Sequence, residues 1–267
     1  MGKRVILVGC GNMGYAMLRG WLDTGKLAPG DLTVVEPNEA LRERSDGHGV
    51  KAVESVDAVD GADLVIFAVK PQVMRSVLPA YRRFAENAAF CSVAAGIGVA
   101  VFTDILGPQA AVIRCMPNTP AAIGKGMMVT FSNEHVTAET ETFVQDLLSA
   151  SGKVATVDDE SLMDAVTAVS GSGPAYVFHF IECLTDAAEK AGLPSETARL
   201  LATQTVYGAA CLTRESGEDP GKLREQVTSP NGTTAAALDV LMGDGRLREL
   251  MSEAVTAAKK RSVELGS

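Results

Sequence analysis

Two short stretches of this sequence hold residue types that can do chemistry. Residues 226–238 read QVTSPNGTTAAAL, where helix-breaking residues interrupt an otherwise helical pattern. Ser229 and Pro230 are typical of an N-cap and the first position of a helix. The backbone N–H groups from Asn231 to Thr234 would then lack intrahelical partners and lie at the positive end of the helix dipole. One interpretation is an ordinary capped loop. The more specific interpretation is an anion-binding pocket whose hydroxyl groups can donate a proton.

The second stretch, VGCGNMG near the N-terminus, has a G-x-G-x-x-G pattern. It follows an apolar run and opens a helical pattern, which is the context that this motif requires. Its glycines allow a tight turn, close approach of N–H groups to a pyrophosphate, and packing of helix on strand. A plain strand–helix turn does not need all three glycines, so we predict a dinucleotide site. The residues predicted to form it are Gly9, Gly11, Asn12, Met13 and Gly14.

Glu36 stands at the end of the next apolar run, close to the spacing of about 20 residues expected for a ribose-binding acid. Its carboxylate can accept a hydrogen bond from a 2′-hydroxyl and would repel a 2′-phosphate. Taken alone, Glu36 favours NADH. Asn38 and Arg42 can still reach a phosphate from this position, so NADPH stays open as the cofactor.

Three further apolar runs end in small or polar residues. The carboxyl ends of strands in an open parallel sheet face the ligand crevice, which makes these residues candidates for cofactor contacts. Lys70 is either a solvated lysine or a group beside the cofactor, and Pro71 directly after it favours the second. For MPNTP (116–120), a capped loop and a place near the nicotinamide are about equally good interpretations. The residues predicted here are Ala68, Val69, Lys70, Pro71, Ala95, Gly96 and Asn118.

The elements that must position these residues follow from the apolar patterning. Strand-like runs lie at 4–9, 31–37, 62–69, 89–96, 110–116, 126–132 and 152–157. Because they alternate with helical patterns, they predict a mainly parallel sheet covered on both faces. Only helical patterns follow, and the first and longest of them is interrupted at GSGP. We therefore expect an α/β protein, with a Rossmann-type dinucleotide-binding domain over 1–160 and an all-α domain for dimerisation and substrate binding over 161–267.

Composition narrows the possible functions. Hydrophobic residues make up 46% and charged residues 21% of the chain, as in ordinary globular proteins. A net charge of −9 and no basic stripe argue against nucleic acid as a partner. No apolar run is long enough to span a membrane or to act as a signal peptide, so the cytoplasm is the expected location. Five scattered cysteines without CxxC, and three separated histidines, argue against a metal site or disulfides.

The motifs VGCGNMG, AVKPQ, SVAAGI, MPNTPAAIGKG, SGSGPAYVF and VTSPNGTTAAAL, in this order, resemble pyrroline-5-carboxylate reductase. The resemblance covers essentially the whole chain, and its last two motifs are the most specific. It implies the last step of proline biosynthesis, in which NADPH or NADH reduces the C=N bond of 1-pyrroline-5-carboxylate to give L-proline. It also implies an interlocked homodimer and, in some members, a decamer of five dimers. This chain departs from the family's usual pattern at Asn231, where a glycine is usual, and at Glu36, where many relatives have a small or basic residue.

The resemblance also assigns roles in the C-terminal stretch. Thr234 matches the hydroxyl that hydrogen-bonds the imine nitrogen and is the family's proposed proton donor. A threonine hydroxyl is a weak acid at neutral pH, so orientation or proton relay is the favoured role. The implied substrate contacts are Ser229, Asn231, Gly232, Thr233 and Thr234. The resemblance further implies that this loop of one chain lies over the cofactor crevice of its partner.

Two other functions fit part of the pattern. A β-hydroxyacid dehydrogenase needs a lysine on the long helix after residue 160, and the sequence offers only Lys190, far beyond the GSGP break. A nonenzymatic nicotinamide-binding sensor would keep the glycine pattern but would not need TSPNGTT. The reductase accounts for both stretches and is the prediction.

Overall fold

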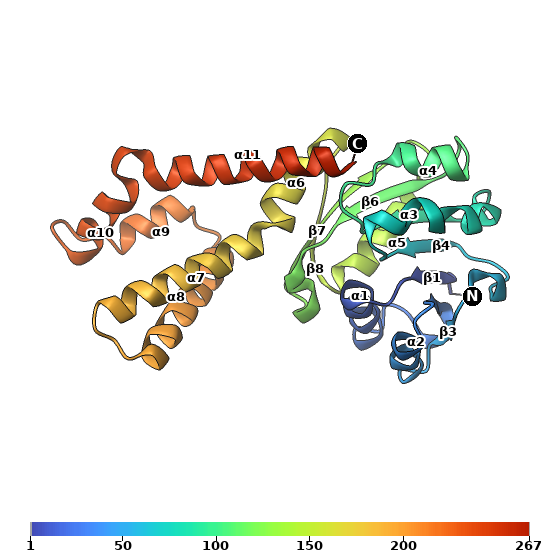
Figure 1. Cartoon of the computed structure of the whole chain (residues 1–267), viewed down its shortest axis with the longest axis horizontal. Helices are drawn as coiled ribbons and strands as arrows, with labels where there is room; N and C mark the ends of the chain where they lie inside the picture. The colour runs from blue at the N-terminus through green and yellow to red at the C-terminus, as the bar shows by residue number, and fades with distance from the viewer. Residues whose placement is uncertain (1, 267) are drawn as a thin grey trace. The chain divides into compact units, whose positions relative to one another are not determined.

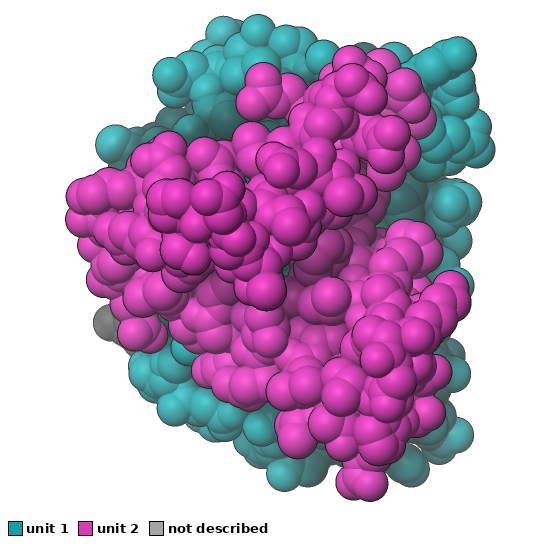
Figure 2. Space-filling view, turned by 90° about the vertical axis from the view of Figure 1, so that its left-hand side faces the viewer, with its two compact units in different colours: residues 1–172, 258–267 teal, residues 173–257 magenta. Residues whose placement is uncertain are grey.

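The computed structural model describes residues 2–266 and consists of two compact units. The sheet unit contains the residues up to 172 together with those from 258 onward, and the helical unit is Gly173–Ala257 (Figures 1 and 2). Helix α11 (Arg246–Gly266) begins in the helical unit and ends in the sheet unit. Residues 161–172 and the end of α11 group with the sheet unit, and the predicted domain boundary at residue 160 stays a prediction.

The sheet unit is built on eight strands in the order β3-β2-β1-β4-β5-β6-β7-β8. The strands are β1 (Val5–Val8), β2 (Leu32–Val35), β3 (Lys51–Val53), β4 (Leu64–Phe67), β5 (Ala89–Ser92), β6 (Val112–Met116), β7 (Gly126–Ser132) and β8 (Gly152–Thr156). Every neighbouring pair is parallel except β6 and β7, which are antiparallel. The predicted mainly parallel, Rossmann-type sheet is confirmed.

Alternate side chains of the strands enter two different cores, because successive residues of a strand point to opposite faces of a sheet. Val5 and Leu7 pack into the core that includes α1 (Asn12–Asp23) and α5 (Ala138–Ser149). Ile6 and Val8 pack into the other core, with α3 (Pro71–Val77) and α4 (Val99–Leu106). Helices therefore cover both faces of the sheet (Figure 1), which explains why the central strands are apolar throughout.

Two local features differ from the sequence pattern. Strand β3 was not expected, because it has only three residues, of which Lys51 is exposed, and it shows no useful alternation. It forms as an edge strand by parallel pairing with β2. The second feature is at Pro79, where α3 has ended at Val77 and Leu78–Phe84 continues as a 3-10 helix. Proline cannot supply the N–H that an α-helix would need there.

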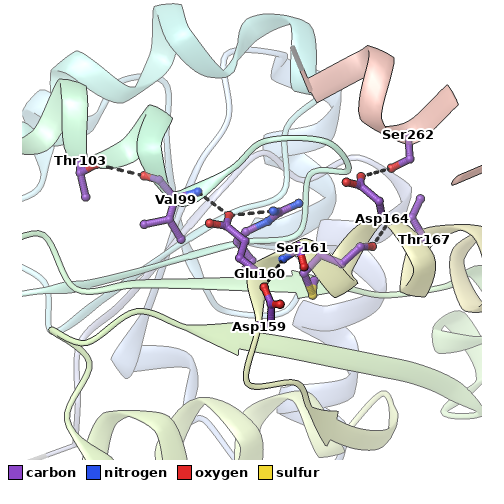
Figure 3. Close-up of polar contacts among 10 residues, drawn as sticks. Val99, Thr103, Asp159, Glu160, Ser161, Asp164, Thr167 and Ser262 are labelled. Carbon is purple, nitrogen blue, oxygen red and sulfur yellow. Dashed lines mark hydrogen bonds and ion pairs between the residues drawn. The ribbon is translucent and has the colours of Figure 1, made fainter. Parts of the chain in front are cut away.

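The segment after β8 holds several parts of the sheet unit together through polar contacts (Figure 3). Glu160 Oε1 accepts hydrogen bonds from Val99 N at 2.8 Å and from Arg114 Nη1 at 2.7 Å. Nearby, Ser262 Oγ donates to Asp164 Oδ1 at 2.6 Å. One short segment therefore links the start of α4, strand β6 and the last turns of α11.

The helical unit has the all-α structure that was predicted. Its helices are α7 (Gly173–Lys190), α8 (Ser195–Ser216), α9 (Pro220–Gln226), α10 (Thr233–Met242) and the first part of α11. Helices α7 and α8 lie side by side (Figure 1). None of the residues of α7, α9 or α10 is buried, and α8 buries only Ala198 and Ala202. The described part of this unit therefore has very little core of its own.

Two further helices belong to the sheet unit. They are α2 (Glu39–Asp46), between β2 and β3, and the short α6 (Met163–Val166), which comes shortly before the helical unit. A π-helical turn, Thr167–Gly171, follows α6 and ends at the predicted GSGP break. Within residues 2–266, no helix combines the length and apolar content needed to cross a membrane.

Candidate active site

The glycine pattern lies between β1 and α1, at the carboxyl end of a central strand. Gly9 has φ +88°, and an added Cβ would lie 2.8 Å from Val69 Cγ1 and 2.9 Å from Ala68 O. At Gly14 an added Cβ would lie 2.3 Å from Gly9 O. The first and third glycines are therefore required by the packing of the chain on itself.

Gly11, unlike Gly9 and Gly14, is not required by packing within the chain. An added Cβ at this position would meet no atom within 4 Å, so the fold itself does not exclude a side chain. Gly11 is also the N-cap of α1, which has no side-chain cap and no acidic residue in its first turn. The first N–H groups of α1 thus have no side-chain cap and lie at the positive end of the helix dipole. Such an open, uncapped helix start fits the pyrophosphate of a dinucleotide.

Glu36 follows β2 beside this glycine loop and is 7% exposed. Its Oε2 accepts a hydrogen bond from Cys10 N at 2.8 Å, and its Oε1 accepts one from Asn38 N at 3.0 Å. The carboxylate therefore fixes the glycine loop to the end of β2, in addition to any contact it makes with a ligand.

Arg44 and Tyr15 form part of the same site and were not identified from the sequence. Arg44 Nη2 donates to Cys10 O at 2.5 Å, and its guanidinium lies 3.7 Å from the centre of the Tyr15 ring. The sequence of residues 40–49 indicates a short helix that frays. Its apolar pattern does not predict that Arg44 contacts the glycine loop. A basic residue soon after the acidic end of β2 was the one available signal.

Cys10, in the middle of the glycine pattern, is not suited to nucleophilic chemistry. Burial raises the pKa of the Cys10 thiol, while the hydrogen bond from Ser45 and the charge of Arg44 act in the opposite direction. Ser45 Oγ lies 3.1 Å from Cys10 Sγ. A buried thiol with a raised pKa stays protonated near neutral pH and packs as a small apolar side chain.

The ends of β4 and β5 lie beside the end of β1, as predicted from a parallel sheet. Ala68 N donates to Val8 O at 2.8 Å, which continues the pairing of β4 with β1. Lys70 is exposed and takes the N-cap position of α3, with Pro71 as the first helical residue. These positions are compatible with the predicted cofactor contacts of residues 68–71, which stay predictions.

The turn after β5 has a neighbour that the sequence did not indicate. Gly96 has φ +74°, and a Cβ added there would lie 3.4 Å from Gly266 N at the end of α11. Ala95 precedes it and is half-buried. The last residues described by the structure thus border a turn that was predicted to contact the cofactor.

Asn118, after β6, uses its side chain within the chain itself. Its Nδ2 donates to Ser170 O at 3.2 Å, and its Oδ1 accepts from Met127 N at 2.9 Å. The side chain ties MPNTP to the π-helical turn next to GSGP, where Ser172 N donates to Thr167 O at 2.9 Å. Such π-turns are frequent at functional sites. Asn118 is the N-cap residue of the 3-10 helix Thr119–Ile123, but its side chain does not cap that helix, and a cofactor contact of Asn118 stays a prediction.

The predicted substrate stretch lies in the helical unit and forms a tight turn before α10. Gly232 N donates to Ser229 O at 3.0 Å, and Asn231 has φ +57°. With Pro230 as the second residue, this is a type II β-turn, which requires positive φ at its third residue. Asparagine tolerates this conformation better than most residues, which explains how it replaces the usual glycine.

The expectation that Ser229 caps this helix, with Pro230 in its first turn, is wrong. The N-cap is Gly232, and α10 begins at Thr233 with no side-chain cap. Ser229 instead closes the β-turn through its carbonyl, and its Oγ would lie 2.3 Å from a Cβ at position 232. The free N–H groups are therefore those of the first helical turn, Thr233–Ala235, rather than those starting at Asn231.

A pocket of about 720 Å³ in the sheet unit runs along α1 and the 3-10 helix Thr119–Ile123. Its lining includes Asn12 and Met13 from the glycine pattern. Within residues 2–266, no three His, Cys, Asp or Glu side chains are grouped so that they could hold a metal ion. The groups available for chemistry are main-chain N–H groups at the uncapped start of α1 and, separately in the helical unit, hydroxyl and main-chain groups at the uncapped start of α10.

Comparison with known proteins gives the family. Residues 160–265 match the family model described as pyrroline-5-carboxylate reductase dimerisation, and residues 4–96 match the one described as NADP oxidoreductase coenzyme F420-dependent. The chain is 41% identical to the pyrroline-5-carboxylate reductase of Pseudomonas aeruginosa, over 98% of this chain and 96% of that protein.

Solved structures agree. A pyrroline-5-carboxylate reductase from Coxiella burnetii has a TM-score of 0.94 at 34% identity, with 99% of both chains covered. The pyrroline carboxylate reductase of Plasmodium falciparum with NADP bound has a TM-score of 0.87 at 28% identity, covering 100% of this chain and 99% of that one. By this full-length likeness, the chain belongs to the pyrroline-5-carboxylate reductase family of oxidoreductases.

Proposed function

We propose that this protein reduces 1-pyrroline-5-carboxylate to L-proline with NADPH or NADH. The C=N bond gains a hydride at carbon and a proton at nitrogen, and the nicotinamide leaves in its oxidised form. When bound, the reduced nicotinamide supplies that hydride. The observation that carries the proposal is that one chain has a glycine loop before the uncapped start of α1 and paired threonines at the uncapped start of α10.

The sheet unit is proposed to hold the cofactor. The space at Gly11 and the free N–H groups of α1 suit the pyrophosphate, and Glu36 lies where a ribose-binding acid is expected. Asn12, Met13 and Asn38 belong to the same loops. The ends of β4, β5 and β6 line the same edge of the sheet and are proposed to position the nicotinamide.

The start of α10 is proposed to hold the substrate. The N–H groups of Thr233, Thr234 and Ala235 are available to the carboxylate, and the helix dipole adds about 0.3–1 kcal/mol. Thr234 is half-buried, and its hydroxyl is proposed to hydrogen-bond the ring nitrogen. Since threonine is a weak acid, this hydroxyl orients the ring or relays a proton. Holding the two reactants together supplies most of the rate, because effective molarities reach ~10⁵–10⁸ M in well-oriented pairs.

Dimerisation is proposed to occur through the helical unit. Its helices bury almost nothing within one chain, and Leu200, Tyr207 and Leu250 are 66%, 62% and 62% exposed. Exposed large apolar side chains on helices with so little core call for a partner, and a second copy of the chain is the one expected. Five dimers in a decamer and the cytoplasmic location stay predictions. The mass of the purified protein in solution tests the assembly.

The test of the function is a spectrophotometric assay. Purified protein is mixed with 1-pyrroline-5-carboxylate and with either NADH or NADPH, and loss of the reduced nicotinamide absorbance and formation of proline are followed together. We expect both to occur in equal amounts. Loss of absorbance with a 2-hydroxy acid couple instead, or tight cofactor binding without any turnover, would favour the dehydrogenase or the sensor.

A further inference from the structure

The end of β2 carries an acidic residue held in an unusual network, and we infer that this protein selects NADH over NADPH through Glu36. This inference rests on the proposed function, because it concerns the adenosine end of the proposed cofactor site. It goes further by naming the cofactor and the residue that selects it, which the sequence left open between Glu36 on one side and Asn38 with Arg42 on the other.

The first step is the position of the carboxylate. Glu36 follows β2 at the edge of the sheet where α1 also begins, and dinucleotide sites of this class place the adenosine ribose there. Both carboxylate oxygens are fixed by main-chain donors, Cys10 N at 2.8 Å and Asn38 N at 3.0 Å. The side chain is therefore held in place and cannot swing away to make room for another anion.

The second step is the state of the groups that could bind a 2′-phosphate. The Asn38 N–H is already taken by Glu36, and Asn38 Oδ1 accepts from Leu41 N at 3.2 Å as the cap of α2. Arg42 Nη1 donates to Glu36 O at 2.8 Å and to Pro37 O at 2.6 Å. The main-chain N–H and Oδ1 of Asn38 and the Nη1 of Arg42 are thus committed to the main chain near β2.

Arg44 is the remaining cation nearby, and it is also engaged. Its Nη2 donates to Cys10 O, and its Cζ lies 3.7 Å from the centre of the Tyr15 ring. Tyr15 OH is in turn 3.0 Å from His48 Nε2. The Nη2 group of Arg44 therefore supports the glycine loop from the side, and its Nε is buried without a hydrogen-bond partner.

The third step is what the carboxylate can still accept. An ionised carboxylate has about four acceptor positions, and the two main-chain N–H groups use two of them. A ribose 2′-hydroxyl is a donor and can use a remaining position. A 2′-phosphate is an acceptor with negative charge, so it would gain no hydrogen bond from Glu36 and would be repelled by it. The network favours the cofactor without the phosphate.

The experiment measures binding apart from catalysis. Isothermal titration calorimetry of the wild-type protein with NAD⁺ and with NADP⁺ should give a dissociation constant at least about tenfold lower for NAD⁺, equal to about 1.4 kcal/mol. At equal nucleotide concentration, NAD⁺ should also raise the unfolding temperature more than NADP⁺. Equal binding, or tighter binding of NADP⁺, overturns the inference without any variant being made.

A variant then identifies the residue. Glu36→Gln removes the charge and keeps one oxygen as an acceptor, and it should bring the ratio of the two dissociation constants at least about threefold closer to one, equal to about 0.7 kcal/mol. Glu43→Gln, on the exposed side of α2, removes the same charge nearby and should leave the ratio unchanged. A ratio that does not move in Glu36→Gln, or that moves equally in Glu43→Gln, overturns the assignment to Glu36.

The proposed function and this inference fail in different ways. If NAD⁺ binds more tightly than NADP⁺ but neither reduced cofactor supports reduction of 1-pyrroline-5-carboxylate, the selection stands and the proposed reaction is wrong. If turnover occurs with a higher kcat/KM for NADPH than for NADH, the reaction stands and the selection is wrong.

Discussion

Arg114 and Glu160 form an ion pair whose Nη1–Oε1 distance is 2.7 Å, although 46 residues separate them in the chain. The Arg114 side chain is 11% exposed and that of Glu160 33% exposed. Glu160 Oε1 also accepts from Val99 N, so one oxygen serves strand β6 and the start of α4 together. The pair thus joins the middle of the sheet to the segment from which the chain enters the helical unit.

This arrangement predicts unequal effects of its two partners on stability. Glu160→Ala leaves a buried guanidinium and a helix N–H without their acceptor, and should lower the free energy of unfolding by about 2–4 kcal/mol. Arg114→Met should cost less, because Glu160 keeps Val99 N and can be hydrated. Urea unfolding followed by circular dichroism measures both. As a control, Asp23→Ala removes an exposed pair with Arg19 and should change stability by less than about 1 kcal/mol. Equal losses of unfolding free energy in Glu160→Ala and Asp23→Ala would show that the buried pair stabilises the fold no more than an exposed pair.

The three glycines of the fingerprint should respond differently to alanine. Gly14→Ala places a methyl group 2.3 Å from Gly9 O and should destabilise the fold by about 1–3 kcal/mol. Gly11→Ala meets no atom of the chain, so its unfolding free energy should stay within about 1 kcal/mol of wild type. Its dinucleotide affinity should nevertheless fall at least about tenfold, since backbone must approach the pyrophosphate there. Thermal unfolding and calorimetric titration separate the two effects. Unchanged affinity in Gly11→Ala would place the pyrophosphate elsewhere.

Thr234→Ala tests the hydroxyl at the start of α10. The variant should fold and bind cofactor as wild type does, because Thr234 makes no side-chain cap to the helix. Its kcat with 1-pyrroline-5-carboxylate should fall about 10²-fold or more if the hydroxyl relays or positions the proton. Thr234→Ser, which keeps the hydroxyl, should retain most of the activity. Thr213→Ala, at a half-buried position on α8, is the matched control. Wild-type turnover in Thr234→Ala would remove this residue from the mechanism.

Buried thiols should make the protein less stable at alkaline pH. Burial raises the pKa of the Cys91 thiol from its ordinary 9.0 to about 12, and it also raises that of Cys115. Between these values the unfolded chain has lost the proton that the native state keeps. The free energy of unfolding therefore falls as pH rises above about 9, by at most about 1.4 kcal/mol per pH unit for each thiol.

The urea midpoint measured from pH 8 to pH 10.5 under reducing conditions checks this expectation. Cys91→Ala should show a shallower decline than wild type. Cys183→Ala, at an exposed position on α7, should show the wild-type decline. A midpoint that does not depend on pH above 9 would contradict the role of buried thiols.

The sequence by itself determined the α/β class, the place of the dinucleotide loop and the family. These depend on local information: apolar periodicity, glycines at fixed spacing, and motifs such as VGCGNMG and TSPNGTT whose chemistry is contained in a few consecutive residues. Seven of the eight strands are visible in this way, because most of them are buried and apolar along much of their length.

The tertiary structure decided what depends on residues far apart in the chain. β3 exists through its pairing with β2, and Arg114 within an apolar strand is explained only by Glu160. The sequence predicted that the helix begins at Pro230, but α10 begins at Thr233. The reason is that the Ser229 carbonyl accepts the hydrogen bond of a type II turn. The commitment of both Glu36 oxygens to Cys10 and Asn38 was likewise invisible in the sequence. The three-dimensional packing of strands and loops determines which groups form hydrogen bonds. A local sequence pattern therefore does not show which distant group lies close enough to be a partner.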